Sequence, residues 1–522
     1  MPHRKSLKRQ HKSKYEAAMC DNTMSFQECE LAILRHAVDE SEHLVKKTVA
    51  NSEEVERMIT ILETFLRRKK LICYGGTAIN NILPKDAQFY DRDIEVPDYD
   101  FYSSRPMEDA KELADIYHKE GYAEVEAKSG MHYGTFKVFV NFIPIADITL
   151  LPRPIFQVLS KEAIHIAGIR YCPANFLRMN MYLELSRPMG DVSRWEKLLK
   201  RLVLLNKYYP LKVSGCEHVE IQRPFSSSVS KDIDVGKGKE WKDQTEQNMY
   251  RVARDALIDQ GVIFFGGYAN SLYGRYMPKH ERRLVENIPD FDVIAEQAGE
   301  VAHMVADRLK DAGFRRANVL VRAPIGEILL THYEIRVGDE TIAFVYEPMA
   351  CHNYNRIRIQ DRQVNVATID TLLSFLLAFY YIDRPYYSQF RDRILCIAQF
   401  LFRVQQRNRL EQRGLLKRFS IQCYGKQKTV EDIRAEKTAK YRELSKDPTS
   451  NEFQMWFLKY VPKGGQKKVS SSVASSADAV ATSAVADGTV FVNKKKHRTV
   501  RRRKTGHRKS KRMSPFPTKW FV

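Results

Sequence analysis

The sequence predicts an α+β protein with two tandem domains, each a small mixed sheet flanked by helices, and three repeated motifs support this prediction. LICYGGTA at residues 71–78 returns as VIFFGGYA at 262–269, and VPDYDFYS at 96–103 returns as IPDFDVIA at 288–295. The third motif, a glycine followed by an aromatic residue, occurs at 121–122 and again at 313–314. The spacing is 191 residues at the glycine pair and 192 at the other two motifs, and coincidence rarely keeps such a register.

The predicted elements follow the same order in each copy. An amphipathic helix comes first, and in the first copy Val55, Met58, Leu62 and Phe65 share one of its faces. A short apolar strand, a Gly-Gly pair, a helix, a strand carrying Asp-x-Asp and another helix follow. Each copy then continues into strands before helices close it; these strands are predicted at 134–140 and 144–150, and at 327–337 and 341–346.

The composition indicates where the domains, the connector and the tails begin and end. We expect a basic disordered N-terminus at 1–24, a first domain with N-terminal helices at 25–210, a connector at 211–243, a second domain with C-terminal helices at 244–462, and a disordered basic tail at 463–522. The net charge of +21 lies almost wholly in the two ends, which leaves residues 15–462 nearly neutral. Such ends attract phosphate backbones without reading sequence, and a solvated tail or a targeting signal is the alternative.

Two further features concern location. The longest clean apolar run, residues 371–382, has 12 residues, which is too short to span a bilayer, so we expect a buried helix and no membrane contact. The 8 cysteines are scattered without a CxxC pair, which favours a reducing compartment without a disulfide framework. We therefore expect a cytoplasmic protein, although the basic run in the tail also resembles a nuclear signal.

Three carboxylates form the candidate catalytic set. Asp98 and Asp100 are two residues apart in a predicted strand, so both side chains point to the same face. Neighbouring carboxylates repel each other unless a cation lies between them, and hard oxygen ligands favour Mg²⁺ or Mn²⁺. Asp147 lies in an otherwise apolar predicted strand and supplies a third carboxylate. Three carboxylates can hold two ions about 4 Å apart, so we predict that these three residues are catalytic metal ligands.

The glycine pair is the candidate nucleotide-binding turn. Gly75 and Gly76 end a strand and precede a helix. Glycine lets the backbone approach a triphosphate closely, and a helix N-terminus favours anions. We predict nucleotide binding by both glycines and by Thr77 and Asn80 of the following helix. No G-x-x-x-x-G-K-[ST] is present, so this is not a Walker loop. A lone Gly-Gly or Asp-x-Asp is common in turns and edges, and only the whole conjunction points to chemistry.

That conjunction resembles the DNA-polymerase-β-type nucleotidyltransferases. Two tandem copies closed by helices resemble, more narrowly, the poly(A) polymerase catalytic subunits of large cytoplasmic DNA viruses, over roughly residues 50–410. The resemblance implies template-independent addition of AMP from ATP to RNA 3′ ends, which is mRNA polyadenylation, with two Mg²⁺ or Mn²⁺ ions. It also implies that Asp147 lies nearest the attacking hydroxyl. The implied partners are ATP, an RNA 3′ end and either a second copy in a homodimer or a processivity subunit, in the host cytoplasm or the virion.

The resemblance also implies a lysine that contacts the triphosphate from the helical region after the first copy's strands. Lys197, Lys200 and Lys207 are the candidates, and each of them is equally compatible with a solvated helix face. Arg178 and Asn180 have a similarly weak claim on the nucleotide.

The second copy lacks one carboxylate. It keeps the glycine pair at 266–267 together with Asp290 and Asp292, but Phe344 aligns with Asp147. A phenyl ring cannot bind a metal ion, so we predict a degenerate, inactive copy used for RNA binding, dimerisation or both. The alternative for this copy is a second working site. For the whole chain, the alternatives are a uridylyl-, CCA- or oligoadenylate-forming transferase and a non-catalytic RNA-binding processivity scaffold.

Overall fold

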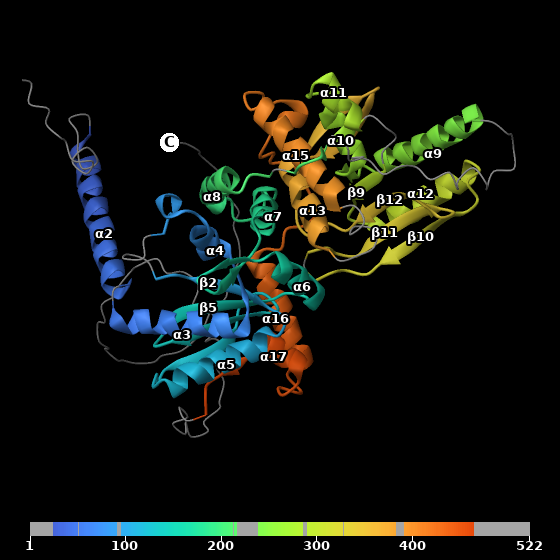
Figure 1. Cartoon of the computed structure of the whole chain (residues 1–522). Coiled ribbons are helices and arrows are strands. Elements are labelled where there is room, and N and C mark those ends of the chain that lie inside the picture. Colours follow the sequence, from blue (N-terminus) through green and yellow to red (C-terminus); the bar gives the residue numbers. More distant parts are fainter. Residues whose placement is uncertain are drawn as a thin grey trace, which may run out of the picture. The chain divides into compact units, whose positions relative to one another are not determined.

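The computed structural model describes residues 24–50, 52–90, 96–211, 213–216, 239–285, 290–326, 328–382 and 391–463 (Figure 1). The expected disordered tail, nearly all of the basic N-terminus and most of the connector lie outside these residues. The described residues form two mixed sheets of eight strands each, together with helices. The predicted α+β fold with two mixed sheets is therefore confirmed.

The first sheet has the strand order β16-β3-β4-β5-β2-β1-β7-β6. Strand β2 runs parallel to β5 and antiparallel to β1, and β1 runs parallel to β7. In sheet order the strands are Lys459–Tyr460, Val125–Ser129, Thr135–Val140, Ile143–Leu150, Tyr99–Ser103, Ile72–Tyr74, Ile169–Tyr171 and Ile164–Ile166.

The second sheet has the strand order β10-β11-β12-β9-β8-β14-β13-β15. Strand β9 runs parallel to β12 and antiparallel to β8, and β8 runs parallel to β14. Seven neighbouring strands thus repeat the order and direction of β3-β4-β5-β2-β1-β7-β6, as the repeated motifs suggested. In sheet order the strands are Ala317–Arg322, His332–Val337, Glu340–Tyr346, Phe291–Ile294, Ile263–Phe264, Arg362–Ala367, His352–Ile359 and Cys423–Tyr424.

The helices begin where the sequence places capping residues. Helix α3 starts after Ser52, whose hydroxyl accepts a hydrogen bond from the Val55 amide, and it buries the predicted apolar face. The α-helices are α2 (Phe26–Ala50), α3 (Glu53–Lys69), α4 (Gly75–Ile82), α5 (Pro106–Lys119), α6 (Arg153–Glu162), α7 (Ala174–Leu185), α8 (Trp195–Tyr208), α9 (Lys239–Asp259), α10 (Gly267–Gly274), α11 (Lys279–Arg282), α12 (Ala298–Asp311), α13 (Ile369–Tyr381), α15 (Arg391–Arg407), α16 (Val430–Leu444) and α17 (Asn451–Phe457).

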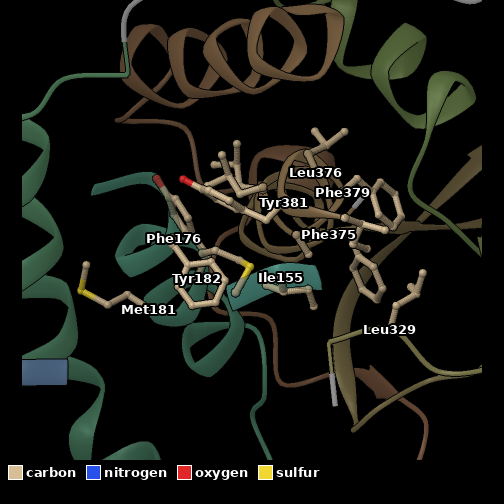
Figure 2. Close-up of a cluster of buried hydrophobic side chains, with 14 of the residues drawn as sticks. Ile155, Phe176, Met181, Tyr182, Leu329, Phe375, Leu376, Phe379 and Tyr381 are labelled. Atoms are coloured by element: carbon tan, nitrogen blue, oxygen red, sulfur yellow. The ribbon is translucent and has the colours of Figure 1, made fainter. Parts of the chain in front are cut away.

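Helix α13 is the apolar run of the sequence, and it is buried nearly all round, as expected. Figure 2 shows its aromatic side chains against those of α7, so that one hydrophobic cluster joins the helices of the two copies. Phe176 of α7 and Tyr381 of α13 meet edge to face, with ring centroids 5.2 Å apart. Burying each such side chain contributes about 1.5–3 kcal/mol, so this cluster stabilises the contact between the two copies. None of the described helices is long and apolar enough to cross a membrane.

The C-terminal segment returns to the first sheet, which the sequence did not indicate. Strand β16 pairs with β3, and the Tyr460 hydroxyl donates to the Asp115 carboxylate at 2.7 Å. Lys437 of α16 donates to the carbonyl of Gly130 at 2.7 Å. Within the segment 430–460, which was expected to belong with the second domain, strand β16 therefore extends the sheet of the first and Lys437 contacts it.

The cysteines differ from expectation. Disulfides join Cys216 to Cys396 and Cys351 to Cys423, across 180 and 72 residues of sequence. The expectation of a chain without disulfides is therefore wrong for this structure. Spacing along the chain could not reveal the pairs, because each forms between segments that only the fold brings together.

Candidate functional site

Four adjacent strands place four functional side chains in one row across the first sheet. Asp100 on β2 lies opposite Asp147 on β5. On the outer sides of this pair, Tyr74 on β1 lies opposite Asp100, and Lys137 on β4 lies opposite Asp147. Asp98 immediately precedes β2 and completes the predicted carboxylate set. The structure thus brings Asp100 and Asp147 together as their motifs suggested.

The pKa values of two of the carboxylates, Asp98 and Asp100, are raised. Burial, and then the charges of Asp98 and Asp147, raise the pKa of Asp100 to about 7. Loss of hydration and then the charge of Asp147 raise the pKa of Asp98, while Lys137 acts in the opposite direction. A carboxyl group that titrates near neutrality at the centre of such a row is typical of a site that binds cations or transfers protons.

Lys137 is a site residue that was not predicted from the sequence. Its ammonium group forms an ion pair with the Asp147 carboxylate at 2.5 Å. The sequence does contain a signal for this residue. TFKVFV alternates buried and half-exposed side chains along β4 and puts the lysine on the half-exposed face. Its role nevertheless depends on the register between β4 and β5, which the sequence alone does not reveal.

Position 75 requires a glycine because the Asp100 side chain lies very close to the backbone there. Its φ angle is +74°, and a Cβ atom there would lie 2.3 Å from Asp100 Oδ2. Gly76 is confined by other groups, because its Cβ would lie 2.4 Å from the Tyr90 hydroxyl and 3.0 Å from the Arg201 guanidinium. The glycine pair therefore lets the protein's own polar groups close around the turn, and binding of a nucleotide there stays a prediction.

Arg201 is the second residue that was not predicted from the sequence. It lies on the buried face of α8, over the rings of Phe89 and Tyr90 at 4.9 and 5.5 Å, and it donates to the Tyr90 hydroxyl at 2.6 Å. The predicted Lys197, Lys200 and Lys207 lie on the same helix, and all three side chains are exposed. The helix thus presents an arginine, rather than one of these lysines, to the glycine turn.

Helix α4 and its neighbours are held by residues that were predicted to bind nucleotide. The Thr77 hydroxyl donates to the backbone carbonyl of Asp98 at 2.5 Å. The Asn80 side-chain oxygen accepts from the amides of Phe89 and Tyr90 at 2.8 and 2.9 Å. Both side chains are buried, so in this structure they position the carboxylate strand and the loop beside Arg201.

The two candidates on α7, Arg178 and Asn180, have different surroundings. Arg178 is only 1% exposed, and its guanidinium donates to Asn206 at 2.7 Å as well as to Asn175 and the carbonyl of Tyr209. It therefore ties α7 to α8 within the protein. Asn180 instead lines a cavity.

This cavity lies beside the carboxylate row and has a volume of about 400 Å³. Tyr102 and Thr149 line it, and each follows a carboxylate of the row by two residues, so both lie on the carboxylate face of the sheet. Most of the remaining lining is apolar and comes from α7, α13 and the second copy, including Phe375 and Gly326. A cavity of this size with a mostly apolar lining suits a small organic ligand.

The corresponding row of the second sheet has a different chemistry. Phe344 on β12 lies opposite Asp292 on β9, where the first sheet has Asp147 opposite Asp100. Glu334 takes the position of Lys137 and is bound by Arg322 and by Thr341, the latter at 2.5 Å. The Asp292 carboxylate accepts a hydrogen bond from the Tyr346 hydroxyl at 3.2 Å. The register places a phenyl ring where the third carboxylate would lie.

The donor set of the first sheet fits divalent cations in its chemistry, although not as a ready-made cage. Within the described ranges, no three His, Cys, Asp or Glu side chains are placed to hold one ion together. Asp147 is instead engaged by Lys137, and the pKa of Asp100 is raised by burial and like charge. A divalent cation would relieve this repulsion, and Asp98, Asp100 and Asp147 offer the oxygen atoms that Mg²⁺ or Mn²⁺ prefers.

A solved structure has a similar fold. The chain is similar to the crystal structure of the Megavirus polyadenylate synthase, with a TM-score of 0.65, 19% sequence identity, and coverage of 85% of this chain and 88% of that one. At this identity the similarity shows the fold.

The family comparison narrows the class for the first copy. The family model of the poly(A) polymerase catalytic subunit matches residues 60–191, a segment that contains the glycine pair and all three aspartates. A protein of African swine fever virus (strain Badajoz 1971 Vero-adapted), provisionally named a poly(A) polymerase catalytic subunit, is 31% identical over 189 residues, which are 35% of this chain and 39% of that protein. A relative from Acanthamoeba polyphaga mimivirus with the same name is 32% identical over 185 residues, 34% of this chain and 30% of its own.

These matches confirm the resemblance to the viral poly(A) polymerase catalytic subunits. The chain spans about two fifths or less of the length of these curated relatives. The matched family segment ends before α8 and before the second sheet, so Arg201 and the second copy lie outside it.

Proposed function

We propose that this chain is a polynucleotide adenylyltransferase, a poly(A) polymerase that adds AMP from ATP to RNA 3′ ends without a template. The observation that carries the proposal is the row of Asp98, Asp100 and Asp147 at the paired strands β2 and β5, within the segment that matches the family. The 3′-oxygen of RNA attacks the α-phosphorus of ATP in line, the bond to the β-phosphate breaks, and pyrophosphate leaves. No covalent intermediate with the protein is needed, because positioning and charge neutralisation suffice.

The side chains divide this work between them. Asp98, Asp100 and Asp147 would hold two Mg²⁺ or Mn²⁺ ions, which supply activation of the attacking hydroxyl and neutralisation of the phosphates. Arg201 lies against Gly76 and places a buried positive charge beside the glycine turn, where the triphosphate would lie. The cavity next to Tyr102 and Asn180 has room for the base. Mg²⁺ or Mn²⁺, ATP and RNA are therefore the proposed cofactors and substrates.

Paired variants test the proposal. Asp98→Asn with Asp100→Asn is expected to lower the rate of AMP incorporation into a short RNA by at least about 10³-fold, since the ions that neutralise the phosphates would be lost. Asp290→Asn with Asp292→Asn is the matched control in the second copy and is expected to leave the rate within about twofold. Incorporation would be followed on a denaturing gel, and folding by circular dichroism.

The outcomes separate the alternatives. If UTP were incorporated in preference to ATP, the chain would be a uridylyltransferase and the adenylyl assignment would be wrong. If the Asp98→Asn, Asp100→Asn variant kept full activity, these aspartates would not be catalytic, and an RNA-binding scaffold would be the better description of the chain. Near-complete loss in the second double variant, with its fold intact, would mean that the second copy is not inert. The homodimer or processivity subunit and the location in host cytoplasm or virion stay predictions.

A further inference from the structure

The described part of the second copy carries a dense group of exposed cations away from its sheet. Residues 275–283 and 407–417 contain eight lysines and arginines but two acidic residues, Glu281 and Glu411, while residues 15–462 as a whole are nearly neutral. All eight cationic side chains are exposed. The charge is therefore gathered here and not spread over the surface.

The two segments lie side by side, and we call them together the basic patch. The Asn408 amide donates to the carbonyl of Tyr276 at 3.5 Å, and the Tyr273 hydroxyl donates to the carbonyl of Leu415 at 3.1 Å. In addition, Arg403 of α15 forms an ion pair with Glu281 of α11 at 3.0 Å. Figure 1 shows α10, α11 and α15, which carry or adjoin the patch, gathered at one end of the second copy.

Helix stabilisation accounts for only part of this charge. Cations favour helix C-termini, and Arg275, whose guanidinium donates to the carbonyl of Leu272 at 2.9 Å, and Arg407 in the last turn of α15 both fit that role. Lys279 is the first residue of α11, where a cation is unfavourable, and Arg409 and Arg413 lie beyond the end of α15. The mutual repulsion of these exposed cations would be relieved by a polyanion.

We propose that the basic patch binds the phosphate backbone of single-stranded RNA and so holds the primer on the second copy. This inference rests on the proposed function for its choice of RNA as the polyanion. Exposed lysines and arginines on helix ends and loops bind phosphates without reading bases, which suits a primer of changing sequence and length. The patch thereby gives the copy that lacks the third carboxylate a part in the reaction.

A charge-neutralising variant tests the patch in the full-length protein. Lys279→Gln, Arg283→Gln, Arg409→Gln and Arg413→Gln would be combined, and binding of fluorescent oligo(A) would be measured without ATP over a range of salt concentrations. The plot of log affinity against log salt should become shallower by about 0.7 for each phosphate that the variant no longer binds, and the Kd should rise at least about tenfold at moderate salt. The matched control combines Arg315→Gln, Arg356→Gln, Arg358→Gln and Lys446→Gln, which remove the same charge from other exposed positions.

The test also separates this proposal from the proposed function. The patch variant should keep its kcat and its KM for ATP at saturating RNA, while its KM for RNA rises. If the parent bound RNA through the patch but added no nucleotide, the patch would stand and the adenylyltransferase assignment would fail. Equal Kd values and salt slopes for the patch variant and the control variant would overturn the patch. Binding of poly-glutamate would be measured in the same way. If the patch variant lost poly-glutamate binding but bound RNA as well as the parent, the proposal would also be overturned, and an acidic protein would be the better partner.

Discussion

At the scale of single residues, the site is governed by like charge. Asp98, Asp100 and Asp147 converge on two paired strands, and Lys137 offsets their charge from within hydrogen-bonding distance of Asp147. The pKa of Asp100 near 7 is the consequence of burial and of this repulsion, and it couples the site to pH over the physiological range. The site should therefore respond measurably to protons and to cations, and each response can be tested separately.

The first prediction concerns stability against pH. The raised pKa means that Asp100 binds a proton more readily in the folded chain than in the unfolded chain, where a carboxyl titrates near 3.8. Its contribution to stability therefore falls as pH rises from about 4 to 7 and is fully unfavourable above 7. In EDTA, Asp100→Asn should raise the free energy of unfolding at pH 8 by on the order of 2–4 kcal/mol and change it little at pH 4.

Urea denaturation at several pH values would measure this difference between variant and parent. Asp86→Asn, at an exposed carboxylate outside the row, is the control and should not reproduce it. An Asp100→Asn variant with the same pH dependence as the parent would show that Asp100 is not electrostatically strained.

The second prediction concerns Lys137. Its charge lowers the pKa values of both Asp98 and Asp100, in opposition to burial and like charge. Lys137→Met should therefore move the acidic limb of the pH–activity profile upward by about half a unit or more, because the carboxylates would lose their protons only at higher pH. Lys137→Arg keeps the charge and should leave the limb near its original position. An unchanged profile in Lys137→Met would assign the lysine a purely structural role.

At the scale of elements, both copies turn from a strand into a helix at a glycine that faces an aspartate. A Cβ on Gly75 would lie 2.3 Å from Asp100 Oδ2, and a Cβ on Gly266 would lie 2.1 Å from Asp292 Oδ2. The crowding is nearly the same in the two turns. The backbone differs, since φ is +74° at Gly75 and −89° at Gly266, so alanine adds backbone strain only at Gly75.

The third prediction uses this pair of turns. Gly75→Ala and Gly266→Ala should each destabilise the protein by about 1–3 kcal/mol, since the turn or the aspartate must shift. Only Gly75→Ala should lower kcat, by at least about 100-fold, because it displaces a residue that would bind metal. Thermal unfolding and steady-state kinetics would be measured on both variants. A similar fall of kcat in Gly266→Ala would show that the second turn is coupled to the reaction.

The sequence predicted the elements whose signal is local. Strands β4 and β5 were placed within one residue, since their alternation is strong, and the α3 face was predicted because 3.6-residue periodicity is visible over 17 residues. The hairpin β6–β7 was not predicted, because its strands have only 3 residues each. The pairing of β16 with β3 was not predicted either, since the choice of a partner more than 300 residues away is decided by tertiary packing.

The same distinction holds for the site. The three aspartates stood out as candidates because Asp98 and Asp100 form a local Asp-x-Asp motif and Asp147 interrupts an apolar strand, and their catalytic role stays a prediction. Lys137 and Arg201 did not stand out, because one depends on the register between strands and the other on which face of α8 packs inward. The sequence offered three lysines of this helix as candidates, but it did not reveal that Arg201 occupies the face against Gly76.

At the scale of the whole molecule, the two copies are joined by a shared core and by a covalent link. Cys216, which follows α8 of the first copy, is bonded to Cys396 in α15 of the second. The bond closes a loop of 180 residues. Crosslinking so long a segment restricts the unfolded chain far more than the folded one, and disulfides typically stabilise by about 2–4 kcal/mol.

The last prediction is that this link holds in solution and stabilises the joined copies. Cys216→Ser with Cys396→Ser should lower the free energy of unfolding by about 2–4 kcal/mol under non-reducing conditions. A reductant should lower the stability of the parent toward that of the double variant, and further if it also opens the Cys351–Cys423 bond. Thiol titration of the unfolded parent before and after reduction would count the bonds independently. If the parent had the same stability with and without reductant and all its thiols reacted, the two cysteines would lie close together without a bond. Noncovalent contacts, among them the apolar cluster of α7 and α13 and the pairing of β16 with β3, would then hold the two copies together.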